Sequence, residues 1–237
     1  MKVLLKLSGQ VLKGEQSVID REYLTKLATV LKSAQDNGHQ VAIVVGGGNI
    51  YRFYKDQRSA EDEKLNHTLA DGRGLLSTVF NGLWLQDIFQ ANGVRSQLFT
   101  SAFADQQFVQ AFDQAKAKAA LEQNDVVILA GGTGKPGFST DSGAVMQASQ
   151  LGIDTILKAT HTYDGVYSAD PATTPTATKY DQLAIDDAIA QDLRFMDASA
   201  LEAAKDGGQR IIVCNGRDPG TLTSVLNGET IGTVVHP

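Results

Sequence analysis

The chain has 237 residues, of which 42% are hydrophobic and 20% charged, the ordinary composition of a globular protein. Its formal net charge of −6 lacks the positive surface that nucleic acid or a membrane attracts, so neither is an expected partner. No apolar run approaches the roughly 20 residues of a membrane span. Cys214 is the only cysteine, which excludes an intrachain disulfide and fits a reducing compartment. Together these features predict a cytoplasmic protein.

Apolar periodicity predicts alternating strands and helices in the first half of the chain. Short β-branched runs indicate strands, and apolar residues at i, i+3 and i+4 indicate helices. Asp20 is the expected cap of the first helix, and Gly72 with Gly74 suggests a break or close packing early in a longer one. The predicted strands are 3–7, 41–45 and 94–100, and the predicted helices are 20–34, 65–91 and 113–122.

The second half of the chain continues this alternation with shorter elements. The predicted strands are 126–130, 155–159, 211–215 and 230–235, and the predicted helices are 144–151, 185–191, 198–206 and 222–226. No repeat or linker divides the chain, so we expect one domain spanning residues 1–237. Strands that alternate with helices favour an α/β fold with a mainly parallel, doubly wound sheet, whose ligands bind at the carboxyl ends of the strands.

The stretch 125–142 carries the strongest functional signal. A buried strand ends there in the glycine-rich turn 131–134, and glycines let the backbone approach a ligand closely. The polar run 139–142 then supplies candidate caps for the next helix. A strand, a glycine loop and a helix start form an anion site, because unpaired N–H groups and the helix dipole point at the loop. The alternative is an ordinary tight turn between a strand and a helix.

Two further glycine turns, 8–9 and 46–48, follow predicted strands and would lie at the same edge of the sheet. Two phosphate charges about 4 Å apart repel by roughly 4 kcal/mol at an effective dielectric near 20, so cations between them would be decisive. Phosphoryl transfer onto a phosphate needs no general base, because the acceptor oxygen is already anionic. We therefore expect two polyanionic ligands to bind face to face at this edge of the sheet. Each cation taken alone could instead be a solvated charge at a strand end. The cations near strand ends are Lys6, Arg52, Lys135 and Lys158.

Several familiar catalytic motifs are absent from the sequence. It contains neither the phosphate-binding pattern G-x-x-x-x-G-K-[ST] nor the nucleophile pattern G-x-S-x-G. The four histidines lack metal-ligand spacing, so no protein-bound metal is expected. Gly132-Thr-Gly134-Lys-Pro-Gly137 formally matches the dinucleotide-binding pattern. The polar residues after Gly137 delay the helix start, which argues against a nicotinamide cofactor.

Six longer motifs occur in a fixed order along the chain: Leu5-Lys-Leu-Ser-Gly9, Val45-Gly-Gly-Gly-Asn-Ile-Tyr-Arg52, Asn81-Gly-Leu-Trp-Leu-Gln-Asp87, Gly132-Thr-Gly-Lys-Pro-Gly-Phe-Ser-Thr-Asp141, Leu157-Lys-Ala-Thr160 and Asp164-Gly-Val-Tyr-Ser-Ala-Asp-Pro171. Each motif alone is shared across a superfamily. The ordered set resembles the bacterial UMP kinases (uridylate kinases) of the amino-acid kinase superfamily, and the likeness continues to Gly232-Thr-Val-Val235.

This resemblance implies a three-layer αβα sandwich that transfers the γ-phosphate of ATP to UMP in pyrimidine nucleotide biosynthesis. It also implies Mg²⁺ carried with ATP, a homohexamer, and GTP or UTP as effectors. The N-terminal part of the domain would mainly bind the acceptor, and the C-terminal part would mainly bind ATP.

The site residues implied by the resemblance form three groups. Lys6 and Lys158 would flank the transferred phosphoryl group and Asp141 would orient them, although an Asp before a helix can be only a cap. The ATP site would comprise Lys6, Ser8, Gly9, Gly48, Arg52, Thr160, Tyr167 and Asp170. The UMP site would comprise Gly47, Asp71, Thr133, Gly134, Lys135, Pro136, Gly137, Phe138, Ser139 and Thr140.

The chain also departs from the family pattern. Family members usually have Asn-Pro and two aromatic residues where this chain has Lys135-Pro136-Gly137-Phe138, and a glycine where it has Phe53. Arg73 is unusual, and the segment 160–164 is one residue longer than usual. These departures bear on substrate selectivity and effector response rather than on the type of reaction.

Two other functions stay open from the sequence. One is a superfamily kinase with a different phosphate or carboxylate acceptor. The other is a non-catalytic nucleotide-binding protein on the same fold. The presence of Lys6, Asp141 and Lys158 argues against the second.

Overall fold

A sheet of nine strands forms the centre of the protein. The computed structural model describes residues 1–51, 66–105 and 107–237. The strand order is β4-β3-β5-β2-β1-β6-β8-β9-β7, and within the described residues only the β8–β9 pair is antiparallel. The predicted mainly parallel sheet is therefore confirmed.

The central strands are the apolar, β-branched runs that the sequence predicted. They are buried on both faces, as strands covered by helices on two sides must be. The strands are β1 Lys2–Leu7, β2 Gln40–Val45, β3 Ser96–Thr100, β4 Gln110–Ala111, β5 Val126–Ala130, β6 Thr155–Thr160, β7 Gln182–Ala184, β8 Arg210–Asn215 and β9 Thr233–His236.

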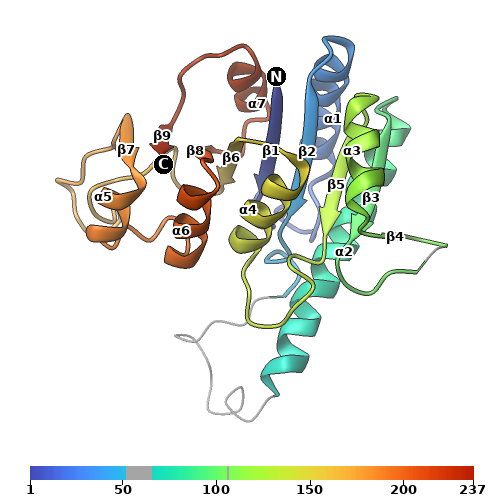
Figure 1. Ribbon diagram of the computed structural model, residues 1–237, viewed down its shortest axis with the longest axis horizontal. Helices are drawn as coiled ribbons and strands as arrows, with labels where there is room; N and C mark the ends of the chain where they lie inside the picture. The colour runs from blue at the N-terminus through green and yellow to red at the C-terminus, as the bar shows by residue number, and fades with distance from the viewer. Residues whose placement is uncertain (52–65, 106) are drawn as a thin grey trace.

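Helices cover both faces of the sheet and complete three layers (Figure 1). On one face, buried side chains of the sheet pack against α1 Arg21–Asp36, α2 His67–Ala91 and α7 Gly220–Leu226. On the other face they pack against α3 Gln114–Glu122, α4 Thr140–Leu151, α5 Ile185–Ala190 and α6 Ala198–Asp206. This arrangement confirms the αβα sandwich. No helix in the described ranges is both long and apolar enough to cross a membrane.

Local sequence signals explain where the long helices begin and continue. The Asp20 side chain accepts the Tyr23 N–H at the start of α1, so the predicted cap is confirmed. A break at Gly72 and Gly74 is wrong, because α2 runs through both residues. A Cβ on Gly72 or Gly74 would meet nothing within 4 Å, so close packing does not require these glycines; the close approach is at Gly47, where a Cβ would lie 2.9 Å from the Gly74 carbonyl oxygen.

The sequence missed two strands and misplaced the start of a third. β4 and β7 are only two and three residues long, and they lie at the two ends of the strand order. Strands this short carry too few residues for an alternating pattern to be visible. β9 begins at Thr233, whereas the sequence placed its start at residue 230.

Candidate active site

Two lysines lie side by side at the carboxyl ends of the two central strands. The parallel register of β1 and β6 pairs Lys6 with Lys158. Leu5 and Leu7 pack into the core under α1 and α2, whereas Leu4 packs into the core under α4. Because side chains alternate along a strand, Lys6 faces the α4 side, as Leu4 does.

Asp141 joins the two lysines from the first turn of α4. Its Oδ1 lies 2.8 Å from Lys6 Nζ, and its Oδ2 lies 2.6 Å from Lys158 Nζ. The helix cap is Ser139, whose Oγ accepts the Ser142 N–H. The interpretation of Asp141 as only a cap is therefore wrong, because both carboxylate oxygens contact a cation.

Burial and mutual contact set the charge states in this cluster, which exposes no more than 13% of any of its three side chains. Burial would raise the pKa of Asp141, but the charges and hydrogen bonds of Lys6 and Lys158 hold it well below its usual range. For Lys158, burial and then the charge of Lys6 lower the pKa to about 8, although Asp141 opposes the shift. Asp141 is thus firmly anionic, and Lys158 loses its proton at a much lower pH than an exposed lysine.

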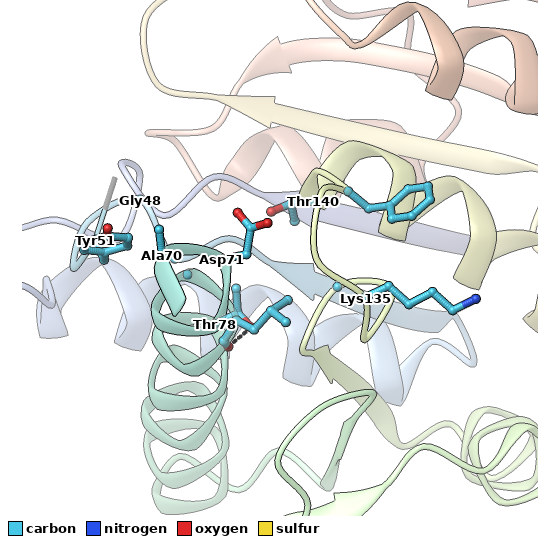
Figure 2. A pocket seen from close by; sticks show the side chains of 12 residues that line it. Gly48, Tyr51, Ala70, Asp71, Thr78, Lys135 and Thr140 are labelled. Carbon is cyan, nitrogen blue, oxygen red and sulfur yellow. Dashed lines mark hydrogen bonds between the residues drawn. The ribbon is translucent and has the colours of Figure 1, made fainter. Parts of the chain in front are cut away.

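A cavity of about 210 Å³ lies between α2 and the loop that precedes α4 (Figure 2). The Asp71 carboxylate accepts a hydrogen bond from the Gly137 N–H at 2.8 Å, which connects α2 to this loop. Figure 2 shows the Lys135 side chain extending away from Asp71. Of the expected UMP residues, those lining this cavity are Gly47, Asp71, Lys135, Phe138 and Thr140, and the expected ATP residue Gly48 lines it as well.

The other expected UMP residues shape the loop but do not line the cavity. Gly134 has a φ of 77°, and a Cβ on it would lie 2.4 Å from the Ser101 carbonyl oxygen, so only glycine fits. The Thr133 hydroxyl lies 3.3 Å from the Lys135 N–H, which donates to it. Pro136 and Gly137 are exposed, and Ser139 is occupied as the cap of α4.

Two further cavities lie beside α5 and the segment that follows it. One cavity of about 330 Å³ is lined by Asp141 and by residues between 188 and 201. The next, of about 420 Å³, is lined by the expected ATP residues Tyr167 and Asp170. The Tyr167 hydroxyl donates to Asp164 Oδ1 at 2.6 Å, which holds its ring at the cavity edge.

The segment 192–195 lines both of these cavities, and sequence reasoning missed it. Its Asp-Leu-Arg-Phe sequence lies between two short helices, where apolar residues without a period look like ordinary packing. The visible signal was Phe195, an aromatic residue outside any predicted element.

The remaining expected ATP residues lie at strand ends. Ser8 and Gly9 directly follow β1, and a Cβ on Gly9 would lie 2.5 Å from the Gly48 nitrogen. Thr160 ends β6, and its hydroxyl donates to the Tyr163 carbonyl, so it shapes the following loop and does not line any of the three cavities described above. Arg52, with the neighbouring Phe53, lies outside the described residues.

Comparison with known proteins identifies the family of this chain. The model of the amino acid kinase family matches residues 1–215. The uridylate kinase of Azorhizobium caulinodans is 40% identical over 237 residues, which cover 100% of this chain and 97% of that protein.

Solved structures extend the similarity to three dimensions. The UMP kinase of Ureaplasma parvum superposes with a TM-score of 0.90 at 30% identity, covering 100% of this chain and 98% of that one. The UMP kinase of Bacillus anthracis superposes with a TM-score of 0.91 at 31% identity, covering 99% and 95%. The chain therefore belongs to the amino acid kinase family and, within it, to the uridylate kinases.

Proposed function

We propose that the protein transfers the γ-phosphate of ATP to UMP, giving ADP and UDP, as a step of pyrimidine nucleotide biosynthesis. The observation that carries this proposal is the Lys6–Asp141–Lys158 cluster. Asp141 lines the cavity beside α5 and α6, and the preceding residue, Thr140, lines the cavity beside α2. Relatives that match the full chain are named uridylate kinases, which supports UMP as the acceptor.

The cluster suits transfer between two phosphates. Lys6 and Lys158 would offset the negative charge that is shared between donor and acceptor as the phosphoryl group moves. Asp141 holds both ammonium groups in place, so the charges are preorganised. No group on the protein has to remove a proton, because the UMP phosphate oxygen is already anionic at neutral pH.

In this proposal, UMP occupies the cavity beside Asp71, where it contacts Gly47 and the loop 133–140. ATP lies with its phosphates at Lys6, Ser8, Gly9 and Gly48 and its adenosine near Thr160, Tyr167 and Asp170. The N-terminal part of one domain, 1–237, would thus mainly serve the acceptor, and the C-terminal part would mainly serve ATP.

Mg²⁺ enters the proposal as the ion carried with ATP. Among the described residues, no group of three or more His, Cys, Asp and Glu could hold a metal ion. Both oxygens of Asp141 are engaged by lysines, so the donor set fits an ion whose ligands are mainly the ATP phosphates. Such an ion offsets phosphate charge.

The cellular setting and the assembly belong to the same proposal. The single cysteine, Cys214, fits a cytoplasmic enzyme. Exposed apolar side chains on α2, among them Leu76 and Phe80, support self-association, for which we propose the homohexamer. Light scattering on the purified protein measures the mass of the assembly and so tests the homohexamer. Activity measured while GTP or UTP is added tests whether either nucleotide is an effector.

A coupled assay of ADP release tests the reaction. We expect Mg-ATP with UMP to give turnover, CMP and dTMP to be far poorer acceptors, and small carboxylic acids to be inactive. ADP release with another acceptor but not with UMP would overturn the assignment of the substrate.

A further inference from the structure

Asn81 places a fully buried amide in the middle of α2, on the side that faces the loop after β2. Its side chain is 0% exposed. Asparagine is a poor residue for a helix interior, and a buried amide is costly unless its hydrogen bonds are made. Asn81 Nδ2 donates to the Gly46 carbonyl and to Asn49 Oδ1, each at 2.7 Å. The Asn81 amide therefore donates its hydrogen bonds to the loop 46–49 and not to its own helix.

Asn49 also donates hydrogen bonds, one back to Asn81 and one to the segment that contains Val18. Its Nδ2 donates to Asn81 Oδ1 at 3.0 Å and to the Val18 carbonyl at 2.7 Å. Asn49 is itself only 8% exposed. The two amides thus form a reciprocal pair in a site where water competes little, which strengthens both hydrogen bonds.

The same loop is packed tightly on two further sides. A Cβ on Gly47 would lie 2.7 Å from Ser77 Cβ on α2, and a Cβ on Gly9 would lie 2.5 Å from the Gly48 nitrogen after β1. The Gln10 side chain donates to the Gly48 carbonyl. Gly47 and Gly48 line the cavity beside Asp71. Small shifts of the Asn81–Asn49 pair would therefore move the backbone that borders both nucleotides.

We propose that Asn81 is a positioning residue for phosphoryl transfer: through Gly46 and Asn49 it sets the backbone that contacts UMP at Gly47 and the ATP phosphates at Gly48. This inference rests on the proposed function, which assigns those two glycines to the two substrates. One buried amide then sets the distance between donor and acceptor without touching either of them.

Asn81→Leu, which keeps a similar volume and removes the amide, tests the proposal against Gln35→Leu as the matched control. Gln35 is also a buried amide, 6% exposed, and it donates to the Arg95 and Asn124 carbonyls at 2.7 Å each. Those carbonyls precede β3 and β5, at the edge of the sheet away from the lysines. Both substitutions remove comparable hydrogen bonds, but only one of them lies at the active site.

We expect Asn81→Leu to lower kcat by about 10- to 100-fold and to raise KM for both nucleotides, because misplacement of about 1 Å can have effects of that size. Gln35→Leu should lower Tm but leave kcat within about twofold when the assay is run well below Tm. Equal kinetics for the two variants at a temperature where both are folded would overturn the proposal.

Asn81→Asp keeps the test decisive if the leucine variant does not fold. Burial raises the pKa of an introduced carboxyl group, and only its protonated form can donate to Gly46. Its kcat relative to wild type should therefore rise as the pH falls. A ratio that is independent of pH would count against the hydrogen bond as the positioning element.

Hydrogen exchange on the ligand-free protein separates this inference from the proposed function. The amides of residues 46–50 should exchange faster in Asn81→Leu than in Gln35→Leu or wild type. Unchanged exchange would overturn the positioning role even if UMP is the substrate. Failure of the wild type to phosphorylate UMP would overturn the function and leave the exchange result standing.

Discussion

Loss of the Lys6 side chain should lower kcat much more than it changes KM for UMP. Lys6→Ala should lower kcat by about 10²–10³, the scale of removing one preorganised charge. KM for UMP should change much less, because the lysine acts where charge shifts during transfer. Lys26→Ala, at an exposed lysine on α1 that pairs with Glu22, is the control and should leave kcat unchanged. A near-normal kcat in Lys6→Ala would remove this residue from the mechanism.

Lys158 gives a pH dependence whose direction follows from its surroundings. Burial and the charge of Lys6 lower its pKa to about 8, and only the protonated form is positive. The ratio kcat/KM for ATP should therefore fall as the pH rises through about 8. Asp141→Asn removes the charge that opposes this shift, so its decline should begin at a lower pH. Identical pH profiles for the two proteins would contradict this account.

At the scale of single residues, the sequence offered candidate site residues but not their arrangement. Lys6 and Lys158 were candidates because they lie at predicted strand ends. Whether Asp141 capped a helix or paired with lysines depended on the register of β1 and β6, which a single sequence does not contain. The direction of the Lys135 side chain was equally out of reach, because the side chain is exposed.

Among the elements, the loop before α4 depends on Asp71. Asp71→Ala should raise KM for UMP with a milder effect on kcat, because it removes both the Gly137 contact and the proposed acceptor for the ribose hydroxyls. Asp71→Asn keeps an oxygen that can accept the Gly137 N–H, so its KM should lie between those of wild type and Asp71→Ala. Steady-state kinetics at saturating ATP measure both. An unchanged KM in Asp71→Ala would exclude Asp71 from UMP binding.

The success of the element predictions depended on length and burial. Long helices show their period over many residues, and buried strands such as β2 and β5 stand out as continuous apolar runs; all of them were found. The sequence left a break in α2 open because glycine lowers helix propensity, whereas packing against the sheet decides the outcome here. The edge strands β4 and β7 exist only because a neighbouring strand is present to pair with them.

For the whole molecule, the sequence predicted alternating elements but not their order in space. The αβα layers followed from the family resemblance, and the strand order needed the structure. In that order β1 is the middle strand, with β6 beside it, and separate apolar cores cover the two faces. The Lys6–Asp141–Lys158 cluster is thus anchored to the middle of the sheet.

The position of the cluster in the sheet determines the order in which mild denaturation removes UMP binding and catalysis. Local opening begins in exposed loops with few buried contacts and reaches central strands last. The loop 133–140 includes exposed residues, whereas Lys6 and Lys158 are carried by the middle of the sheet. In rising urea, KM for UMP should therefore increase well before kcat at saturating substrate declines. If UMP binding and kcat were lost together at the midpoint of global unfolding, the loop 133–140 and the Lys6–Asp141–Lys158 cluster would unfold as one cooperative unit.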